Sequence, residues 1–570
     1  MKGLLSLLFL SINFSLLSQM YLPVWHKQWT NSTAINNSYE IDNKGNHVFL
    51  ADLQGVYDFD PSPSTYSFST SGSIKNGVIY KLDSIGNFIW ALKFTSTNDC
   101  YVRDLNVDDN DNYYFILTYK GTVDVDPGLG IVNITKVSNT AGTEDAIVKI
   151  SKNGNYAWHI RLSNNSYCMY IKKLGIDNSN KLLINAFTDG TIDLDLSAST
   201  YTVPVGNFLA RYDTLANFYL GKSLGISPTS PQLGNFNFDG DNNIVFLGGY
   251  TNSSVDYDLG PATSTLSVLG TNSNYFVLKT DSAFNYQWVN AFHSSSSVSD
   301  TKVLIDSLKN TFICGATSSY TFYPQYNNTT SVYSTGTNSF KVFCIKYNSS
   351  GLYDKDLFLV KPRPFQFDLD RFGNFYFTGW LDASTVDFDI GPSVFNLTGK
   401  IQSDALMVTY DNNFNLRSGY VYTNIGSLDY FQSGYFIKGR GNYIYLVTNQ
   451  LMNVDYAPSA SSYLVNTGTA SGYVLIKFNN GISTNLESNF TNKKFECYPN
   501  PNNGSFVFKI DDEIKDGELV IINSLGQEVH KQRIYKGNNN INQEEFSTGL
   551  YHYTLLQNKN KIGTGKFVIQ

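Results

Sequence analysis

Short segments in which apolar and polar residues alternate cover most of the chain, and turn residues separate them. The stretch FDLDRFGNFYFTGW (367–380) shows an alternating segment, a turn with Gly and Asn, and a second apolar segment. Alternation with a period of two is typical of β-strands. We find no long window with apolar residues at helical spacing, and the many Tyr, Phe, Thr and Asn residues favour strands and turns. The sequence therefore predicts an all-β protein.

One motif returns along most of the chain. It places two aspartates between apolar residues and ends in a turn, as in VDVDPGLG (123–130). Successive copies lie 63 to 69 residues apart and begin at Asp58, Asp124, Asp193, Asp256, Asp387 and Asp455, with a degenerate copy at Tyr323. A regular period of this length indicates a repeat architecture with seven units.

Each repeat contains four segments that read as strands. The motif ends the second strand, and the fourth follows a tight turn, as in GNFIWALKF (86–94). The third carries a basic residue between apolar ones, so we expect it to have one face in solvent; these positions are Lys81, Lys149, Arg211, Lys279, Lys346 and Lys477, with Thr409 in the sixth unit. Four-stranded sheets bury both faces when they pack around an axis. The pattern predicts a seven-bladed β-propeller of four-stranded antiparallel blades.

The two ends of the repeat region complement each other. The seventh unit stops after its third strand, near residue 480, and no fourth segment follows it. The missing segment has a counterpart in LPVWHKQWT (22–30), where Trp25 matches Trp90 of the first unit. We therefore expect residues 22–30 to complete the last blade and to close a propeller that spans residues 20–480, which leaves no open sheet edge.

Two interpretations of the paired aspartates remain open. In the first, the carboxylates accept hydrogen bonds from backbone N–H groups of the following turn, which a motif repeated in every unit favours. In the second, carboxylates two residues apart on one strand bind calcium together with loop carbonyls. The calcium candidates are Asp124, Asp126, Asp256, Asp258, Asp387 and Asp389. We expect no other metal and no cofactor.

Charge and the first residues narrow the function classes. The net charge is −7 and no basic cluster stands out, which argues against nucleic acid as a partner. The stretch MKGLLSLLFLSINFSLLSQ (1–19) places a lysine before an apolar run and small or polar residues after it. This order is typical of a secretory signal peptide, which we assign to residues 1–18; a membrane anchor is the alternative. We expect the mature protein to be exported.

Few residues suggest chemistry. The five cysteines form no C-x-x-C pair, so a cysteine metal site is not expected. Cys100 and Cys168 hold equivalent repeat positions and should lie in different blades, whereas Cys314 and Cys344 fall on neighbouring strands and are candidates for a disulfide. Residues 221–225 fit G-x-S-x-G, but they occupy a fourth-strand position without a following helix. The six histidines show no metal spacing, and we assign no catalytic residue.

The pattern changes after a polar linker at residues 481–493. Short alternating strands with turn signals fill residues 494–570, as expected for an immunoglobulin-like β-sandwich. This region also resembles the type A C-terminal sorting domain of the type IX secretion system. The resemblance rests on Pro499, Asn500, Pro501, Gly504, Gly549, Tyr551 and Lys566. It implies that the tail interacts with the type IX machinery and directs export across the outer membrane, so that the protein is secreted or stays on the cell surface.

The sequence does not name a ligand. We expect a monomeric binding or adhesion scaffold that contacts a glycan or protein through the loops after the second strands, which we call the decorated face. Four aromatic residues of these loops are candidates for ligand contact, with coverage of the blade edge as the alternative: Tyr57, Tyr257, Tyr323 and Tyr456. The alternative is a secreted glycan-active enzyme, a hydrolase or a lyase, with carboxylates near the central channel. Such an enzyme should break the repeat at a few convergent polar positions, and the sequence shows no such concentration.

Overall fold

The computed structural model describes most of the chain as β-strands and turns. The residues described are 23–29, 34–137, 142–162, 169–225, 232–250, 255–268, 273–325, 333–334, 340–382, 384–399, 404–422, 432–441, 443–450, 453–457, 463–467, 472–479, 495–500, 502–510, 517–523, 528–542, 546–557 and 560–569. Within these ranges, no helix has the length and apolar character needed to cross a membrane. The chain divides into two compact units, Met1–Gly481 and Ile482–Gln570. The signal peptide assigned to residues 1–18 and the linker at 481–493 lie outside the described ranges.

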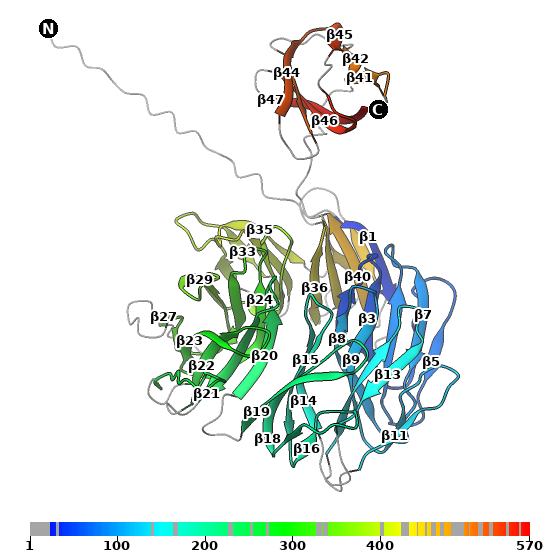
Figure 1. Cartoon of the computed structure of the whole chain (residues 1–570), viewed down its shortest axis with the longest axis vertical. Coiled ribbons are helices and arrows are strands. Elements are labelled where there is room, and N and C mark those ends of the chain that lie inside the picture. Colours follow the sequence, from blue (N-terminus) through cyan, green and yellow to red (C-terminus); the bar gives the residue numbers. More distant parts are fainter. Residues whose placement is uncertain are drawn as a thin grey trace, which may run out of the picture. The chain divides into compact units, whose positions relative to one another are not determined.

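Seven larger antiparallel sheets form the described part of the first unit, and each takes its four main strands in the order first, second, third, fourth (Figure 1). The first strands are β2 (Ala34–Ile41), β8 (Cys100–Val107), β14 (Met169–Ile176), β20 (Gln232–Phe238), β24 (Val298–Ile305), β30 (Arg363–Leu369) and β36 (Gln432–Arg440). The second strands are β3 (His47–Leu53), β9 (Tyr113–Tyr119), β15 (Leu182–Thr188), β21 (Ile244–Tyr250), β25 (Thr311–Thr317), β31 (Phe375–Leu381) and β37 (Tyr443–Gln450).

The third and fourth strands form the outer half of each sheet. The third strands are β6 (Asn76–Leu82), β12 (Glu144–Ile150), β18 (Gly206–Tyr212), β22 (Ser273–Thr280), β28 (Lys341–Tyr347), β34 (Asp404–Tyr410) and β40 (Gly472–Asn479). The fourth strands are β7 (Phe88–Lys93), β13 (Tyr156–Ile160), β19 (Phe218–Gly225), β23 (Tyr286–Ser294), β29 (Tyr353–Val360), β35 (Leu416–Tyr422) and β1 (Pro23–Trp29).

The sheets are arranged as a closed ring. The first strand of each sheet contacts the first strand of the next, from β2 through β8, β14, β20, β24 and β30 to β36, and β36 contacts β2. The first strands are therefore innermost and the fourth strands outermost. Apolar side chains fill the space between neighbouring sheets, as in the cluster of Val48, Val102, Phe115 and Val148. This is the blade arrangement of a β-propeller.

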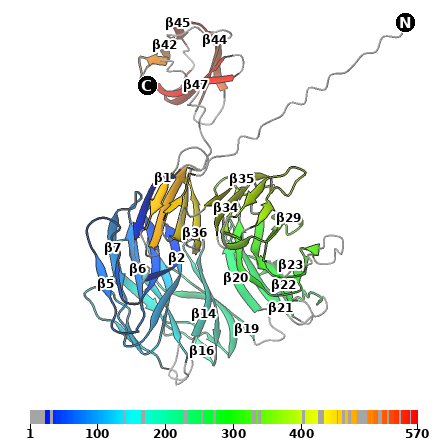
Figure 2. The ribbon, with the colours of Figure 1, turned by 180° about the vertical axis from the view of Figure 1, so that it is seen from behind.

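The strand before the first blade completes the last one. β1 pairs antiparallel with β40, with Trp25 opposite Lys477 and Trp29 opposite Tyr473. In Figures 1 and 2 this blue strand lies beside the orange strands from the end of the repeat region. The indole of Trp29 is 3% exposed and packs against Phe49 and Tyr80 of the first blade. The described part of the predicted segment, residues 23–29, makes the predicted pairing.

The third strands are buried on both faces, which corrects the expectation of one face in solvent. Every residue of β6, β12, β18, β28 and β34 is buried, because each blade packs against neighbours on both sides. Four of the six basic side chains form an ion pair with a nearby aspartate. Lys81 lies 2.9 Å from Asp42, Lys279 lies 2.8 Å from Asp239, and Arg211 pairs with Asp177. A buried charge is tolerated when it is paired and hydrogen-bonded in this way.

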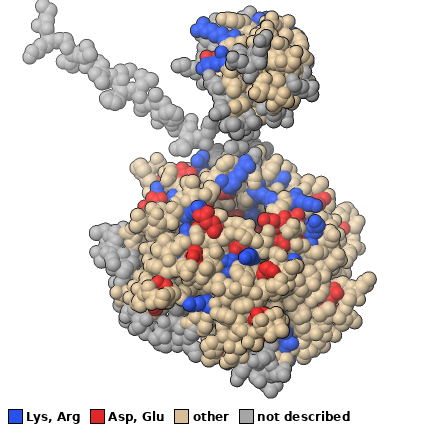
Figure 3. Space-filling view, viewed as in Figure 1, with Lys and Arg blue, Asp and Glu red and all other residues tan. Residues whose placement is uncertain are grey.

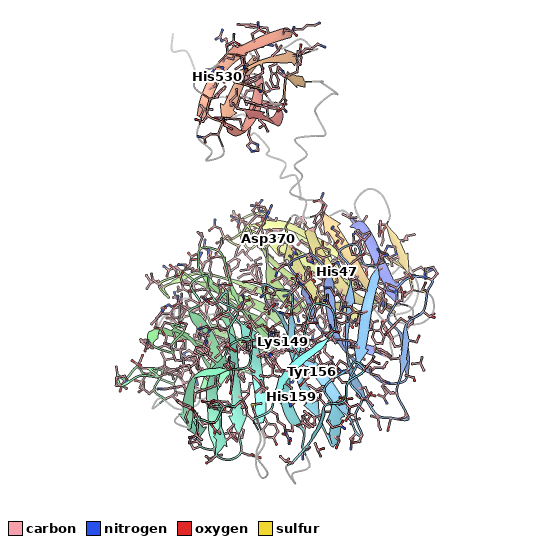
Figure 4. The ribbon with its side chains drawn as sticks, turned by 45° about the vertical axis from the view of Figure 1, so that its right-hand side comes forward. His47, Lys149, Tyr156, His159, Asp370 and His530 are labelled. Atoms are coloured by element: carbon pink, nitrogen blue, oxygen red, sulfur yellow. The ribbon has the colours of Figure 1, made fainter. Side chains whose placement is uncertain are left out.

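Aspartates organise the tight turns between the strands of most blades. Asp370, labelled in Figure 4, accepts the N–H groups of Phe372 and Asn374 at 2.9 Å each. The Asn374 side chain donates to the second carboxylate oxygen at 2.8 Å. Gly373 has φ = 76°, a backbone conformation that glycine adopts without steric cost. The same bonds recur at Asp42, Asp83, Asp213, Asp239, Asp281, Asp306 and Asp411.

Cys314 and Cys344 lie directly opposite each other on β25 and β28, and both are fully buried. Their sulfur atoms are 3.1 Å apart and both cysteines are free thiols. The sequence correctly places them on neighbouring strands, but the disulfide is not formed in this structure. Cys100 is also a buried free thiol, and Cys168 lies outside the described residues.

We expect His47 (Figure 4) to make folding stability depend on pH. Burial, with a smaller effect of Lys477, lowers the pKa of His47 to about 4 from the usual value near 6.5. Between these values the unfolded chain binds a proton that the folded chain does not. The free energy of unfolding should therefore fall by roughly 3 kcal/mol from this site as the pH drops from 6.5 to 4.

Denaturant titrations of wild type and His47→Gln across this pH range measure the effect. The variant should lose part of the pH dependence, whereas substitution of the exposed His552 by Gln should leave it unchanged. Identical pH profiles of wild type and His47→Gln would contradict the assignment.

The second unit consists of two antiparallel sheets around one core. One contains β41 (Phe495–Tyr498), β42 (Ser505–Ile510) and β45 (Gly537–Asn542); the other contains β44 (Glu528–Ile534), β43 (Gly517–Ile522), β46 (Gly549–Gln557) and β47 (Asn560–Ile569). Phe508 and Ile541 from the first sheet meet Leu519 and Phe567 from the second. This is a small β-sandwich; its assignment to the immunoglobulin-like class stays a prediction.

Candidate functional sites

The repeated motif forms a small hairpin after the second strand of most blades. The sequence predicts a loop here, and in the structure this part of the chain turns back and pairs with itself. The pairs are β4 (Val56–Asp58) with β5 (Ser67–Ser69), β10 (Thr122–Asp124) with β11 (Asn133–Thr135), β16 (Ile192–Asp193) with β17 (Thr202–Val203), β26 (Thr321–Tyr323) with β27 (Tyr333–Ser334), β32 (Thr385–Asp387) with β33 (Asn396–Thr398), and β38 (Asn453–Asp455) with β39 (Leu464–Asn466). In the fourth blade a single bridge joins Asp256 to Thr265.

The paired aspartates hold these hairpins through backbone hydrogen bonds. One carboxylate oxygen of Asp124 accepts the N–H groups of Asp126 at 3.1 Å and of Val132 at 2.8 Å. Asp126 accepts the N–H of Gly128 at 2.9 Å. The first aspartate makes the same two bonds in the other copies: Asp58, Asp193, Asp256, Asp387 and Asp455. This geometry supports the turn interpretation.

The described residues contain no group of three or more His, Cys, Asp or Glu side chains that could hold a metal ion. Each calcium candidate pair therefore offers two carboxylates, both of which already accept backbone N–H groups. Calcium binding by these aspartates stays a prediction.

The hairpins also join neighbouring blades. The N–H of Asp124 in the second blade donates to the carbonyl of Thr95, which follows the outer strand of the first blade, at 2.9 Å. The N–H of Thr97 donates in turn to the carbonyl of Thr122 at 2.8 Å. In the fifth blade the hairpin strand β26 pairs with β23, the outer strand of the fourth blade. We call these contacts the inter-blade latches.

Three of the four aromatic residues proposed for ligand contact are buried. Tyr57, Tyr257 and Tyr456 are 2%, 0% and 1% exposed, and Tyr323 is partly buried. Tyr57 packs against Phe59, and Tyr257 packs against Phe276. The expectation that Tyr57, Tyr257 and Tyr456 contact a ligand is therefore wrong, whereas for Tyr323 it stays a prediction. The three buried rings occupy the inward-facing position of the hairpin and cover the blade edge, because side chains alternate between the two faces of a strand.

We expect Asp124→Ala to destabilise the protein by about 2 kcal/mol, because it removes an ionised acceptor from two backbone N–H groups. Asp126→Ala should cost less, since Asp126 accepts one such bond at a more exposed position. Asp124→Asn retains an acceptor and should fall between wild type and Asp124→Ala. Urea unfolding followed by tryptophan fluorescence measures these differences. Equal losses in the two alanine variants would contradict the assigned role of Asp124.

The exposed parts of the hairpins carry apolar residues. Ile131 is 76% exposed, Val394 is 71% exposed and Leu129 is fully exposed. Further exposed apolar side chains on the same hairpins are Leu196, Tyr201, Ile390, Leu464 and Tyr66. Single exposed apolar residues are common on protein surfaces, but here they recur at the same feature of several blades. The decorated face therefore presents repeated apolar tips.

A cavity of about 340 Å³ lies in the central channel of the ring. All seven innermost strands contribute to its wall: Glu40 from β2, Asn106 from β8, Lys173 from β14, Asn237 from β20, Lys302 from β24, Gln366 from β30 and Lys438 from β36. Figure 3 shows acidic and basic side chains gathered around a hollow on this unit. These residues lie in the half of each first strand that leads to the first tight turn, away from the hairpins.

Two ion pairs line the channel. Lys438 lies 2.8 Å from Glu40, and Lys173 pairs with Asp104. Burial lowers the pKa of Lys438, but the carboxylates of Glu40 and Asp368 outweigh it and raise the pKa above its usual value. Asp104 sits at φ = 63° in an irregular position of β8, where the strand register shifts. β-bulges of this kind redirect side chains and are common beside functional sites.

This cluster was not predicted from the sequence. No concentration of polar residues that break the repeat was expected, but the structure brings Glu40, Lys173, Lys302, Gln366 and Lys438 to one cavity. The first strands could have indicated this cluster. Their polar residues differ from blade to blade, whereas the aspartate motif and the third strand are similar in most blades. Bulges in the first strands obscure the register that would have aligned them.

The G-x-S-x-G segment and two of the histidines have structural roles. Residues 221–225 lie in β19, and Tyr201 donates a hydrogen bond to the carbonyl of Gly221 at 2.7 Å. They form no strand-to-helix turn, so the nucleophile interpretation is not supported. His47 contacts the hydroxyl of Tyr39 at 2.8 Å, and His26 contacts that of Tyr463 at 2.9 Å.

The sorting motif residues lie around the end of the last strand of the second unit. Asn500 accepts the N–H of Val568 at 2.9 Å, and the N–H of Asn502 donates to the carbonyl of Val568 at 3.0 Å. Gly504 has φ = 95° and donates its N–H to the Asn502 side chain. The start of this unit thus holds the C-terminal strand β47 in place.

The other sorting motif residues support the same end of the sandwich. Tyr551 is 6% exposed, stacks on Phe567, and donates its hydroxyl to the carbonyl of Ser547 at 2.8 Å. Gly549 begins β46 with an extended backbone. Pro501 and the side chain of Lys566 lie outside the described residues.

Comparison with known proteins assigns the second unit. Residues 496–570 match the secretion system C-terminal sorting domain. The predicted resemblance of the tail is therefore confirmed. This domain implies export to the cell surface or secretion, and interaction with the type IX secretion machinery. None of the curated proteins matches the chain.

Solved structures similar to the chain include propellers. The Dos1 propeller is 9% identical, with a TM-score of 0.36 over 81% of this chain and 96% of that chain. Prolyl oligopeptidase B from Galerina marginata is 7% identical, with a TM-score of 0.38 over 84% of this chain and 55% of that chain. PorZ, a surface component of the type-IX secretion system of Porphyromonas gingivalis, is 10% identical, with a TM-score of 0.18 over 96% of this chain and all of that chain. These scores are too low to support an argument about function.

Proposed function

We propose that the protein is a binding or adhesion scaffold that the C-terminal sorting domain delivers to the cell surface or the medium. The partner is a glycan or a protein, and the decorated face of the propeller contacts it. The repeated apolar tips of the hairpins carry this proposal, because exposed apolar side chains that recur in one region mark interaction surfaces. Leu129 and Ile131 of the second blade are the clearest of these tips.

A rigid framework favours the same use. The paired aspartates hold most of the hairpins through backbone hydrogen bonds, and the inter-blade latches tie the hairpins of the second and fifth blades to the preceding sheet. Little conformational entropy is therefore lost when the tips contact a partner. Repetition adds a second advantage, since several weak contacts on one scaffold combine into stronger overall attachment.

Arrays of glycans and surface proteins, probed with the purified chain with and without calcium, test this proposal. The double variant Leu129→Asp/Ile131→Asp should lose binding to any partner that wild type retains. Leu352→Asp is the matched control, because Leu352 is 66% exposed but lies in a tight turn between a third and a fourth strand. Equal binding by wild type and the double variant would contradict the role of the tips.

A glycan-active enzyme is the second candidate, and the channel is the observation that favours it. Glycoside hydrolysis needs two carboxyl groups that face a bound sugar, and the carboxylates of Glu40, Asp104 and Asp368 lie on the innermost strands. Two of these carboxylates already belong to ion pairs with lysines. Steady turnover of an offered polysaccharide, lost in Glu40→Gln, would favour the enzyme over the scaffold.

A further inference from the structure

The central channel contains one lysine that has no acidic partner. Lys173 and Lys438 both form ion pairs with carboxylates. Lys302 forms no ion pair with any described residue. Its ammonium donates one hydrogen bond, to the carbonyl of Phe367 at 2.7 Å, although an ammonium has three N–H groups to donate.

The surroundings of Lys302 leave its positive charge incompletely balanced. The pKa of Lys302 is lowered to about 8, and burial is the largest cause. Lys438 on β36 and Lys173 on β14 act in the same direction as burial, whereas Asp368 on β30 and Glu40 on β2 act against it. A desolvated charge without a partner costs free energy, and an anion placed beside it would remove that cost.

A neutral hydrogen-bonding group lines the same cavity as this ammonium. Gln366 lines the same cavity and directly precedes Phe367, the residue whose carbonyl accepts from Lys302. The side-chain amide of Gln366 makes no hydrogen bond within the described residues. An amide N–H and an ammonium that line one cavity can donate to the two oxygens of a carboxylate.

The size of the cavity limits what can enter. Its volume of about 340 Å³ is at the lower end of the range of small-molecule pockets. The carboxylates of Glu40, Asp104 and Asp368 on the surrounding strands repel ligands with several negative charges. A small molecule with a single carboxylate fits both limits.

We propose that the central channel binds a small molecule with one carboxylate group, no larger than a monosaccharide acid, with Lys302 as its ion-pair partner and Gln366 as a hydrogen-bond donor. This site lies at the opposite end of the blades from the hairpin tips. It is independent of the scaffold function proposed above.

Isothermal titration of the full chain with glucuronate, acetate and glucose at constant ionic strength tests the proposal. Glucuronate should bind at pH 7, and neutral glucose should bind at least tenfold more weakly. Lys302→Met should weaken glucuronate binding at least tenfold, and Lys302→Arg should retain it. Lys309→Met is the control, because Lys309 pairs with Asp241 on the surface outside the channel. If acetate binds as tightly as glucuronate, the site recognises the carboxylate alone; if glucuronate binds more tightly, it recognises a sugar acid.

The dependence of binding on pH separates a direct charge interaction from a structural effect. Glucuronate keeps its charge between pH 7 and 9.5, whereas the ammonium of Lys302 loses its proton in this range. Wild type should therefore lose affinity as the pH rises, and Lys302→Arg should not, because arginine stays charged. The proposal is wrong if neither carboxylate binds, or if Lys302→Met binds glucuronate as wild type does.

Discussion

Chains that lack residues 496–570 should fail to reach the cell surface or the medium. These residues match the C-terminal sorting domain, and a sorting signal that is absent cannot engage the export machinery. The propeller unit has its own sheets and cores, so deletion of the tail should leave the propeller folded. Immunoblots of cell, surface and medium fractions measure the effect, with the full chain as reference.

A single substitution in the tail provides a milder version of this experiment. Asn500→Ala removes the acceptor for the N–H of Val568 and loosens the end of β47. It should reduce the exported fraction without abolishing it, whereas Asn503→Ala, at an exposed neighbouring position, should have little effect. Normal export of the chain that lacks residues 496–570 would contradict the assigned role of the tail.

Removal of residues 19–30 should destabilise the propeller by more than about 3 kcal/mol, the usual minimum for loss of one buried tryptophan side chain. The deletion takes away β1, exposes the edge of β40, and leaves Phe49 and Tyr80 without the indole of Trp29. An unpaired strand edge also promotes aggregation. Thermal unfolding and light scattering of the purified variant measure both effects.

A synthetic peptide of residues 20–31 should restore the stability of this deletion variant when added in excess. Binding of the peptide to the folded ring shifts the unfolding equilibrium by mass action. A peptide in which Trp29 is replaced by Ser should not restore it, while replacement of the half-exposed Val24 by Ser should be tolerated. Full stability of the deletion variant without any peptide would show that ring closure does not depend on β1.

The fold could be predicted largely because its signals are local and repeated. Alternation reveals each strand, and the recurring aspartates at Asp124 and its equivalents set the period. Even the pairing of β1 with β40 follows from counting strands, although the two lie far apart in the sequence. Solvent exposure was predicted less well. A basic residue such as Lys81 suggests a wet face, but its buried partner Asp42 belongs to a different strand pair and is not visible as a pattern.

The candidate sites could be predicted less well than the fold. The sequence points to the hairpins because the motif repeats there. Tyr57 and Tyr257 nevertheless face inward, because successive side chains of a strand point to opposite faces and a shift of one residue exchanges the buried and exposed positions. The channel residues Lys302 and Gln366 carry no repeated pattern. They come together only because seven first strands converge on one axis, and bulges shift their register. Such convergence is a property of the tertiary structure.

The inter-blade latches bear on how this ring comes apart. Many repeat proteins lose their units one at a time, since each unit depends only on its neighbours. Here each latched hairpin forms backbone hydrogen bonds with the sheet of the preceding blade. The closed ring also has no terminal unit from which fraying could start. Melting should therefore be all-or-none across this unit, and partial digestion should yield either intact rings or small peptides rather than a ladder of blades.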